Sequence, residues 1–223
     1  MSPETKARHE RLLTHTKYPP KSRIFASGDV GDRIYLIMSG HVRLFSLHED
    51  GKEVTLSILG PGDVFGELAL FGEKQRQRFA ETMDEAVVCS APTPEFLEIM
   101  ADVPELARRI AAIITRRVLQ AEMQIENLAY TGVRGRIIGV LLQLAQSVGE
   151  HVEGGTKIAL RLSRQDLASF AGTSRETCSI ELQRLAREGV IGFTDDGYIV
   201  VRNLSKLRPE LADRIRAGLR IGA

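Results

Sequence analysis

A run of four polar residues near the end of the chain carries two hydroxyls, a guanidinium and a carboxylate: Ser174, Arg175, Glu176 and Thr177. A guanidinium can donate two hydrogen bonds to the edge of a guanine, and a carboxylate can accept one from a cytosine amino group. Hydroxyl groups can bind backbone phosphates. These side chains can act together only if they project from the first turn of one helix that enters a groove of the double helix.

The flanking sequence predicts such a helix, preceded by a second one across a tight turn. Ser163 and Asp166 have capping-box spacing at the start of the first helix, and Gly172 ends it. Either Thr173 or Ser174 caps the second helix. Its buried face consists of Cys178, Leu182 and Leu185. The same pattern also fits two amphipathic helices of any small bundle, so the context must decide.

The neighbouring segments predict a winged helix-turn-helix. Residues 190–193 and 198–201 are β-rich runs that flank Asp195-Asp196-Gly197, which is a strong hairpin pattern. Upstream, we expect a helix over residues 133–147, a polar loop over residues 149–155, and a strand at residues 158–160.

A second stretch, from Pro61 to Ala80, has residues suited to a nucleotide. Gly66 is followed by Glu67, and either Arg76 or Arg78 lies on a nearby strand. Backbone amides and a bidentate cation can hold a phosphate, while a carboxylate can bind a ribose hydroxyl. On spacing alone, a surface turn with an exposed arginine explains the pattern better.

The first hundred residues are rich in short strands separated by glycines, which predicts a small antiparallel barrel or jelly roll. The expected strands lie at residues 24–25, 34–37, 42–45, 54–58 and 86–88. Pro104 then begins a long helix. Its apolar residues recur at heptad-like spacing: Ile110, Ile114, Val118, Ala121, Ile125 and Leu128. We interpret this stripe as a dimer seam, with a core helix of a single domain as the alternative. Thr131-Gly132 is the expected hinge.

The segment from Ser163 to Ile191 resembles the DNA-binding end of the cyclic-AMP receptor protein/FNR family of transcription regulators. The likeness is carried by Ser-Arg-Glu-Thr at residues 174–177 and by Ser179. It fails at Ile180 and Glu181, where the family often has an arginine and an apolar residue. It implies that Arg175 reads guanine and Glu176 reads cytosine. The DNA-contacting set that it implies is Arg164, Ser174, Arg175, Glu176, Thr177, Ser179 and Ile180.

Residues 23–45 and 61–71 are similar to the cyclic-nucleotide-binding roll of the same family. The resemblance implies that Gly66 and Leu68 lie in a phosphate-binding cassette and that Glu67 contacts the ribose. It leaves Arg76 and Arg78 as alternatives for the phosphate arginine. Gln77 can donate to a phosphate oxygen, and Ala121 and Glu122 stand where cyclic-AMP responders present hydroxyls to the adenine. The implied effector-binding set is Gly66, Glu67, Leu68, Arg76, Gln77, Arg78, Ala121 and Glu122.

The resemblance therefore implies an α+β fold with three parts. These are an effector β-roll at residues 1–103, a dimerisation helix and hinge at 104–131, and a winged helix-turn-helix at 132–223. We expect a homodimeric regulator, an activator or a repressor, that binds a two-fold DNA operator under the control of cyclic AMP or a related effector. RNA polymerase is the implied partner, with residues 149–157 as the expected contact. A constitutive regulator with a ligand-free roll is the main alternative.

Composition and net charge narrow the classes of protein to which this chain can belong. The 223 residues are 43% hydrophobic and 26% charged, which is typical of a globular protein, and the net charge of +1 gives no global attraction to DNA. A local basic segment spans residues 202–220. No apolar run suits a signal peptide or a membrane span, so we expect a cytoplasmic protein without membrane contact.

The sequence gives no support for catalysis or a metal centre. Two cysteines are too few for an iron-sulfur cluster. His41, His48 and His151 have no nucleophile or metal-ligand spacing around them, so we expect neither an enzyme nor a metal site. A nucleotide-regulated enzyme and a redox sensor acting through Cys178 are the less favoured alternatives.

Overall fold

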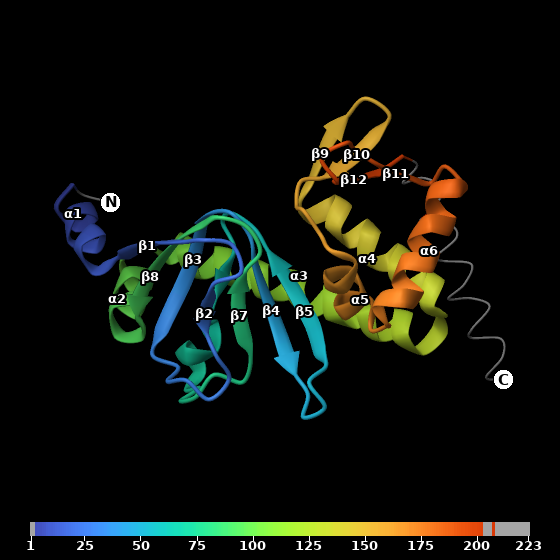
Figure 1. Cartoon of the computed structure of the whole chain (residues 1–223). Coiled ribbons are helices and arrows are strands. Elements are labelled where there is room, and N and C mark those ends of the chain that lie inside the picture. Colours follow the sequence, from blue (N-terminus) through green and yellow to red (C-terminus); the bar gives the residue numbers. More distant parts are fainter. Residues whose placement is uncertain (1–2, 203–206, 208–223) are drawn as a thin grey trace. The chain divides into compact units, whose positions relative to one another are not determined.

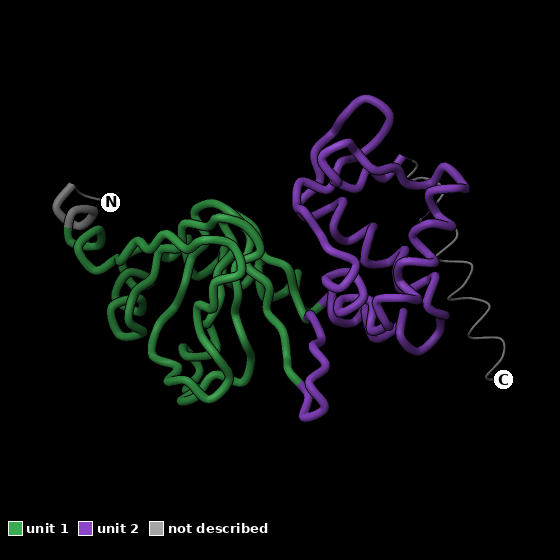
Figure 2. The backbone as a smooth tube through the Cα atoms, viewed as in Figure 1, with its two compact units in different colours: residues 1–47, 56–118 green, residues 48–55, 119–223 purple. Residues whose placement is uncertain are grey.

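The computed structural model describes residues 3–202 and residue 207, with side chains from residue 8 onward. It divides into two compact units (Figure 2). The first unit comprises residues 1–47 and 56–118, and the second comprises residues 48–55 and 119–223. The basic residues that the sequence shows beyond Arg202 lie outside the described part of the chain. None of the described helices has the length and apolar character needed to cross a membrane.

The first unit is a β-roll made of two four-stranded antiparallel sheets (Figure 1). Their orders are β1-β8-β3-β6 and β2-β7-β4-β5. The strands are β1 (Thr14–Tyr18), β2 (Arg23–Phe25), β3 (Arg33–Ser39), β4 (Val42–Leu47), β5 (Glu53–Leu59), β6 (Val64–Phe65), β7 (Phe79–Thr82) and β8 (Ala86–Pro92). The helical elements are α1 (Pro3–Leu12), η1 (Glu67–Phe71), α2 (Thr93–Asp102) and the long α3 (Pro104–Tyr130), of which residues 119–130 belong to the second unit.

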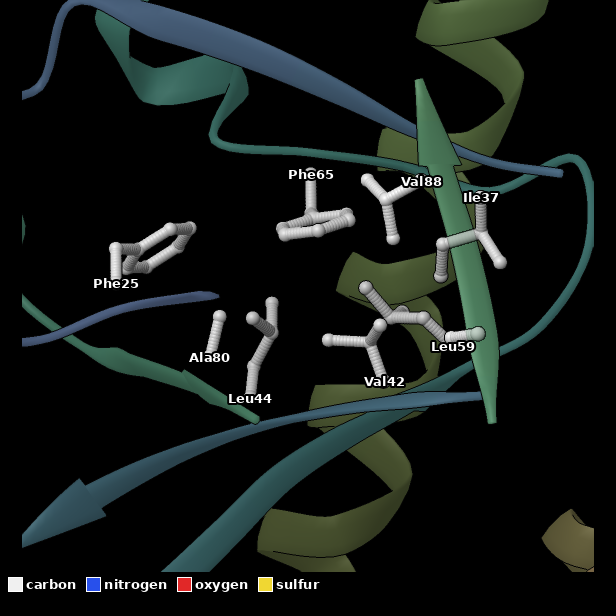
Figure 3. Packing of buried hydrophobic residues seen from close by; sticks show 9 residues of the cluster. Phe25, Ile37, Val42, Leu44, Leu59, Phe65, Ala80 and Val88 are labelled. Atoms are coloured by element: carbon white, nitrogen blue, oxygen red, sulfur yellow. The ribbon is translucent and has the colours of Figure 1, made fainter. Parts of the chain in front are cut away.

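Apolar side chains from both sheets fill the space between them (Figure 3). Ile37 of β3 and Val88 of β8 meet Val42 and Leu44 of β4, with Phe65 packed beside them. Phe65 is fully buried, and its ring stacks on that of Tyr35 with the centroids 4.9 Å apart. Burial of this apolar surface is the main force that holds the two sheets together.

All five strands predicted in the roll are present, but three further strands were missed. The polar segment Thr14–Tyr18 forms β1, which pairs with β8 at the edge of its sheet. An edge strand needs no apolar alternation on its free side, so its sequence resembles that of a loop. The other two, β6 and β7, are only two and four residues long.

The long helix α3 begins at Pro104 as predicted, but its apolar stripe serves two purposes. Ile110 is buried and Ile114 is partly buried, and both pack into a core cluster of the roll with Ile34 and Phe96. The first two positions of the expected dimer seam therefore belong to the core of their own chain. Beyond them, the exposed apolar residues of α3 are Val118, Leu119, Met123, Ile125 and Leu128.

The second unit contains the winged helix-turn-helix. Its elements are α4 (Val133–Ser147), β9 (Gly149–Val152), β10 (Gly155–Ile158), α5 (Arg164–Ala171), α6 (Arg175–Arg187), β11 (Ile191–Phe193) and β12 (Ile199–Val201). The strand order is β11-β12-β10-β9. The expected polar loop at residues 149–155 is wrong, because it forms β9 and the turn into β10. Within this unit the tip of the β4–β5 hairpin is tied to α5, since the Thr55 amide donates to Ser169 Oγ at 3.1 Å.

The chain breaks between α3 and α4 at Thr131-Gly132, as the sequence predicts. Small residues let the two helices approach closely there. A Cβ on Gly139 of α4 would lie 2.6 Å from the Asn127 side-chain nitrogen, and one on Gly135 would lie 2.6 Å from the Thr131 Cβ. These distances are shorter than any van der Waals contact, so glycine is required at both positions for this packing.

Candidate functional site

A small, solvent-open cavity lies in the roll beside the turn that joins β6 to η1. It is lined by Phe25, Leu44, Gly66, Glu67, Leu68, Glu73, Arg76, Gln77 and Arg78. Six of these nine residues were predicted from the sequence to bind an effector. The other two residues of that prediction, Ala121 and Glu122, are exposed on α3 and do not line the cavity.

Gly66 adopts a backbone conformation that positions the cavity wall. Its φ is +75°, in the left-handed region that only glycine enters without strain. A Cβ at this position would stand 2.9 Å from the Arg33 carbonyl oxygen and 3.1 Å from Arg76 Nη1. The chain therefore needs a glycine here both for its φ angle and for the close approach of Arg76.

The two candidate arginines occupy different environments. Arg76 is 2% exposed, and it donates to the carbonyl oxygens of Gly66, at 3.1 Å from Nη1, and of Arg33. Its guanidinium carbon lies 4.7 Å from the centroid of the Phe25 ring. Arg78 is exposed on the same cavity. Gln77 is also exposed, and its amide donates to the Gln75 carbonyl at 3.2 Å.

Two ion pairs compensate the charges around the cavity. Glu67 lies 3.3 Å from Arg117 of α3, and Glu73 lies 3.7 Å from Arg76. All four side chains are at most 16% exposed. Within the described residues, the buried Nε of Arg76 has no hydrogen-bond partner. A donor that is buried without a partner is costly, so an acceptor that reached this atom would lower the free energy of the site.

Sequence reasoning missed Glu73 and Arg117 as parts of this site. Glu73 lies in a turn with no distinctive pattern. Arg117 was noted only as a flanking charge, although it stands seven residues after Ile110 and three after Ile114. That spacing places it on the face of α3 that packs against the roll, and helical periodicity alone contains this information.

The helix-turn-helix is built by local capping. Ser163 Oγ accepts a hydrogen bond from the Asp166 amide, and Asp166 Oδ2 accepts one from the Ser163 amide. These two bonds complete the predicted capping box. Gly172 ends α5 with φ of +59°. Ser174, and not Thr173, caps α6, because its Oγ accepts from the Thr177 amide at 3.1 Å. The buried face of α6 is Cys178, Leu182 and Leu185, as predicted.

The predicted DNA-reading residues lie together on the first turns of α6. Ser174, Arg175, Glu176 and Ile180 are exposed, whereas Thr177 and Ser179 are half-buried. Arg164, at the start of α5, is also half-buried. Arg175 and Glu176 are thus exposed in the first turn of α6, which is the part of a recognition helix that approaches base edges.

A further arginine, missed by sequence reasoning, fixes the turn between the two helices. Arg136 of α4 donates from Nε to the Ala171 carbonyl at 2.9 Å and from Nη2 to the Gly172 carbonyl at 3.3 Å. These carbonyls belong to the C-terminal end of α5, where the orphan acceptors of a helix need partners. Arg136 therefore helps to fix the turn that leads into α6.

Two family models match the chain in the order roll, then helix-turn-helix. The cyclic nucleotide-binding domain matches residues 15–103, and the Crp-like helix-turn-helix domain matches residues 135–210. The chain belongs to the cyclic-AMP receptor protein/FNR family of transcription regulators. The similar proteins are transcription regulators and not enzymes, which confirms the expectation that this chain is not an enzyme.

Relatives in this family align over most of both chains. The Cyclic AMP receptor protein of Thermus thermophilus is 36% identical over 190 residues, covering 85% of this chain and 84% of the relative. The CRP-like cAMP-activated global transcriptional regulator of Mycobacterium tuberculosis is 33% identical over 200 residues, covering 90% and 89%.

Solved structures of the family share the fold. A transcriptional regulator of the CRP/FNR family from Thermus thermophilus superposes with a TM-score of 0.71 at 32% identity, covering 90% of this chain and 98% of that one. The c-di-GMP responsive global regulator CLP of Xanthomonas campestris gives a TM-score of 0.74 at 25% identity, covering 89% and 99%. The α+β fold predicted from the sequence is therefore confirmed. Among the described residues, no group of three or more His, Cys, Asp or Glu side chains could hold a metal ion.

We expect Gly66→Ala to destabilise the roll more than Gly72→Ala. Both glycines have positive φ and flank η1, so each substitution costs about 1–2 kcal/mol for the left-handed backbone. Only at Gly66 does the new Cβ meet neighbouring atoms, because nothing lies within 4 Å at Gly72. Calorimetric unfolding of the two variants measures the difference, and equal losses would show that the close approach of Arg76 is not required.

We expect the Cys178 thiol to be unreactive at neutral pH. It is fully buried, and burial raises its pKa to about 11, although nearby Arg164 opposes the shift. The thiolate fraction at pH 8 is therefore on the order of one in a thousand, and it should rise about tenfold per pH unit toward pH 10. Labelling of a Cys89→Ser variant with a thiol-disulfide reagent tests this. Rapid native labelling at pH 8 would restore the redox-sensor alternative.

Proposed function

We propose that this protein is a homodimeric DNA-binding regulator whose affinity for its operator is controlled by cyclic AMP bound in the β-roll. The observation that supports this most strongly is the buried Arg76 guanidinium, which faces a cavity beside Gly66 and Glu67. A cation buried this deeply with a free Nε is suited to a cyclic phosphate, which carries one negative charge and several acceptor oxygens.

In this proposal each cavity residue has a role. Arg76 binds the phosphate, with Gly66 and Leu68 in the wall around it and Gln77 as a further donor. Glu67 accepts from a ribose hydroxyl. Because Glu67 is already paired with Arg117, a bound ribose shares this carboxylate with α3. Arg78, which is exposed, has a secondary part or none.

The names of relatives favour cyclic AMP, since two of the similar proteins are described as a cyclic AMP receptor and a cAMP-activated regulator. The structural relative CLP is described as responsive to c-di-GMP, a larger effector with the same phosphate chemistry. Ala121 and Glu122 offer no hydroxyl to an adenine, so we propose that adenine selectivity is weaker here than phosphate and ribose recognition.

One observation favours the constitutive regulator as a second candidate. The cavity charges already compensate one another, because Glu67 pairs with Arg117 and Glu73 pairs with Arg76. A roll whose charges are paired in this way can be a stable scaffold without a ligand. For the cavity to bind a phosphate, the ion pair between Glu73 and Arg76 must break so that Arg76 can bind the phosphate instead.

We propose that the exposed part of α3 forms the dimer seam. Val118, Ile125 and Leu128 are each more than half exposed, which is unusual for large apolar side chains on one helix. A second copy of α3 is the occupant that heptad spacing favours. Bound effector would repack the paired helices about the Gly132 hinge and set the spacing of the two α6 helices.

At the DNA, Arg175 reads guanine and Glu176 reads cytosine, while Ile180 meets the base pair that a second arginine reads elsewhere in the family. Arg164 and the hydroxyls of Ser174, Thr177 and Ser179 contact phosphate. Ser174 and Thr177 also bond each other, with their hydroxyl oxygens 2.9 Å apart, so one donor between them remains for DNA.

We further propose the working division of the chain as 1–103 for the effector roll, 104–131 for the dimerisation helix and hinge, and 132–223 for the winged helix-turn-helix. RNA polymerase is the proposed partner, and the β9–β10 hairpin, within residues 149–157, is its proposed contact. Action on operator DNA places the protein in the cytoplasm.

We expect cyclic AMP to tighten operator binding in the wild-type chain and in Arg78→Gln, and to have no such effect in Arg76→Gln. Arg78→Gln is the matched control, because it removes the same charge from the same cavity at an exposed position. Fluorescence anisotropy of a palindromic family-type duplex at fixed salt measures the affinities. Tight binding of the wild type that is unaffected by nucleotide would establish the constitutive regulator.

We expect Ile125→Asp to give monomers with greatly reduced operator affinity. The substitution places a charge in the proposed seam, where it would be buried without a partner in the dimer. Val152→Asp is the control, since it makes the same kind of change at an exposed apolar residue of β9. Sedimentation velocity gives the oligomeric state, and a dimer that survives Ile125→Asp would show that the seam lies elsewhere.

A further inference from the structure

The hairpin of β11 and β12 is the wing of the winged helix-turn-helix. Its tip is acidic, which is unfavourable for an element that approaches DNA. The turn between β11 and β12 contains Asp195 and Asp196, and both are exposed. The turn is well ordered, because the Thr194 amide donates to the Tyr198 carbonyl and the Tyr198 amide donates to Thr194 Oγ1, each at 2.9 Å. Carboxylates repel the phosphate backbone, so this tip is unsuited to contact it.

The strands of the wing nevertheless carry two aromatic rings that hold cations from outside the wing. Phe193, the last residue of β11, is 41% exposed, and the Arg164 guanidinium carbon lies 4.6 Å from its ring centroid. The centroid of the Tyr198 ring lies 5.6 Å from the Arg161 guanidinium carbon and 5.3 Å from the Lys157 ammonium nitrogen. All three distances are within the range of a cation–π interaction.

The Arg164–Phe193 pair lies close to the recognition helix. Arg164 is the first residue of α5, immediately after the capping residue Ser163. Helix α5 packs against α6, and β11, which ends at Phe193, also contacts α6. Lys157, by contrast, already pairs with Glu150 at 2.7 Å.

We propose that Phe193 is a positioning residue for DNA binding, whose ring holds the Arg164 guanidinium beside α6 where it meets a backbone phosphate. The inference rests on the proposed DNA interface. A free arginine side chain loses considerable rotamer entropy when it makes such a contact, and stacking on a ring removes part of that loss beforehand. The wing therefore acts through the arginine that it holds, while its acidic tip stays away from phosphate.

The experiment is a double-mutant cycle of Phe193→Leu and Arg164→Ala in the full chain with cyclic AMP present. Duplex affinity is measured by anisotropy over a range of salt concentrations. Arg164→Ala should lower the slope of log affinity against log salt by about one. Phe193→Leu should weaken binding about two- to five-fold when Arg164 is present and should have no further effect when Arg164 is absent.

Two controls separate positioning from folding and from base reading. Phe193→Tyr keeps the ring and should restore wild-type affinity. Phe193→Leu should weaken operator and unrelated duplexes by the same factor, because a phosphate contact carries no sequence information, whereas Arg175→Ala should reduce the discrimination between them. Thermal unfolding of each variant confirms that the unit remains folded.

Each contrary result has a distinct meaning. Equal losses from Phe193→Leu in both backgrounds would overturn the inference, since the ring would then act independently of Arg164. An unchanged salt slope in Arg164→Ala would also overturn it, while leaving base reading by α6 intact. A wild-type chain that binds no duplex would instead overturn the proposed function itself.

Discussion

The guanidinium of Arg76 is a permanent positive charge inside the roll, and the wall of the cavity is arranged around it. A charge in such a place costs several kcal/mol unless it is compensated. The carbonyls of Gly66 and Arg33 accept from it, Glu73 lies 3.7 Å away, and the Phe25 ring covers one side. The left-handed Gly66 is required for this arrangement, because any Cβ there would press on Arg76 and on the Arg33 carbonyl. Strand β3, the β6–η1 turn and the aromatic core are thus tied together by one side chain.

Arginines fix the second unit in a similar way. Arg136 satisfies the carbonyls at the end of α5 and so sets the turn into α6, and Arg164 rests on Phe193 of the wing. Helix α3 contributes a further arginine of this kind, since Arg117 forms an ion pair with Glu67 at the cavity. If a ribose binds Glu67, the charge balance beside α3 changes, and this change acts on the same helix that carries the exposed apolar stripe. Recognition of an effector and pairing of two chains would then depend on neighbouring turns of one helix.

Local features of the sequence predicted the helical parts well. The capping box at Ser163, the glycine at Gly172 and the break at Gly132 are decided by residues close in sequence, and each appears as expected. Strand β1 was missed because its partner β8 lies about seventy residues later in the sequence, with Tyr18 opposite Ala86, and because its polar residues show no pattern. Sequence could not choose between Arg76 and Arg78, since residues two apart share a face in the strand that we expected there. In the structure both arginines precede β7, which begins at Phe79. Burial distinguishes them, and burial depends on Phe25, Arg33 and Gly66 together. Glu73 was missed because its turn has no distinctive pattern, whereas the helical spacing of Arg117 from Ile110 and Ile114 could have identified it.

The measurement that tests the role of Arg76 most directly is the nuclear magnetic resonance signal of its Nε–H group. A chain with isotopically labelled arginine gives one such signal for each ordered guanidinium, and Arg76→Lys identifies the one that belongs to Arg76. The account predicts that cyclic AMP shifts this signal strongly, because the buried Nε gains a phosphate acceptor, and that adenosine, which lacks the phosphate, does not. A signal that stays unchanged while cyclic AMP binds elsewhere on the chain would contradict the assignment of Arg76 as the phosphate ligand.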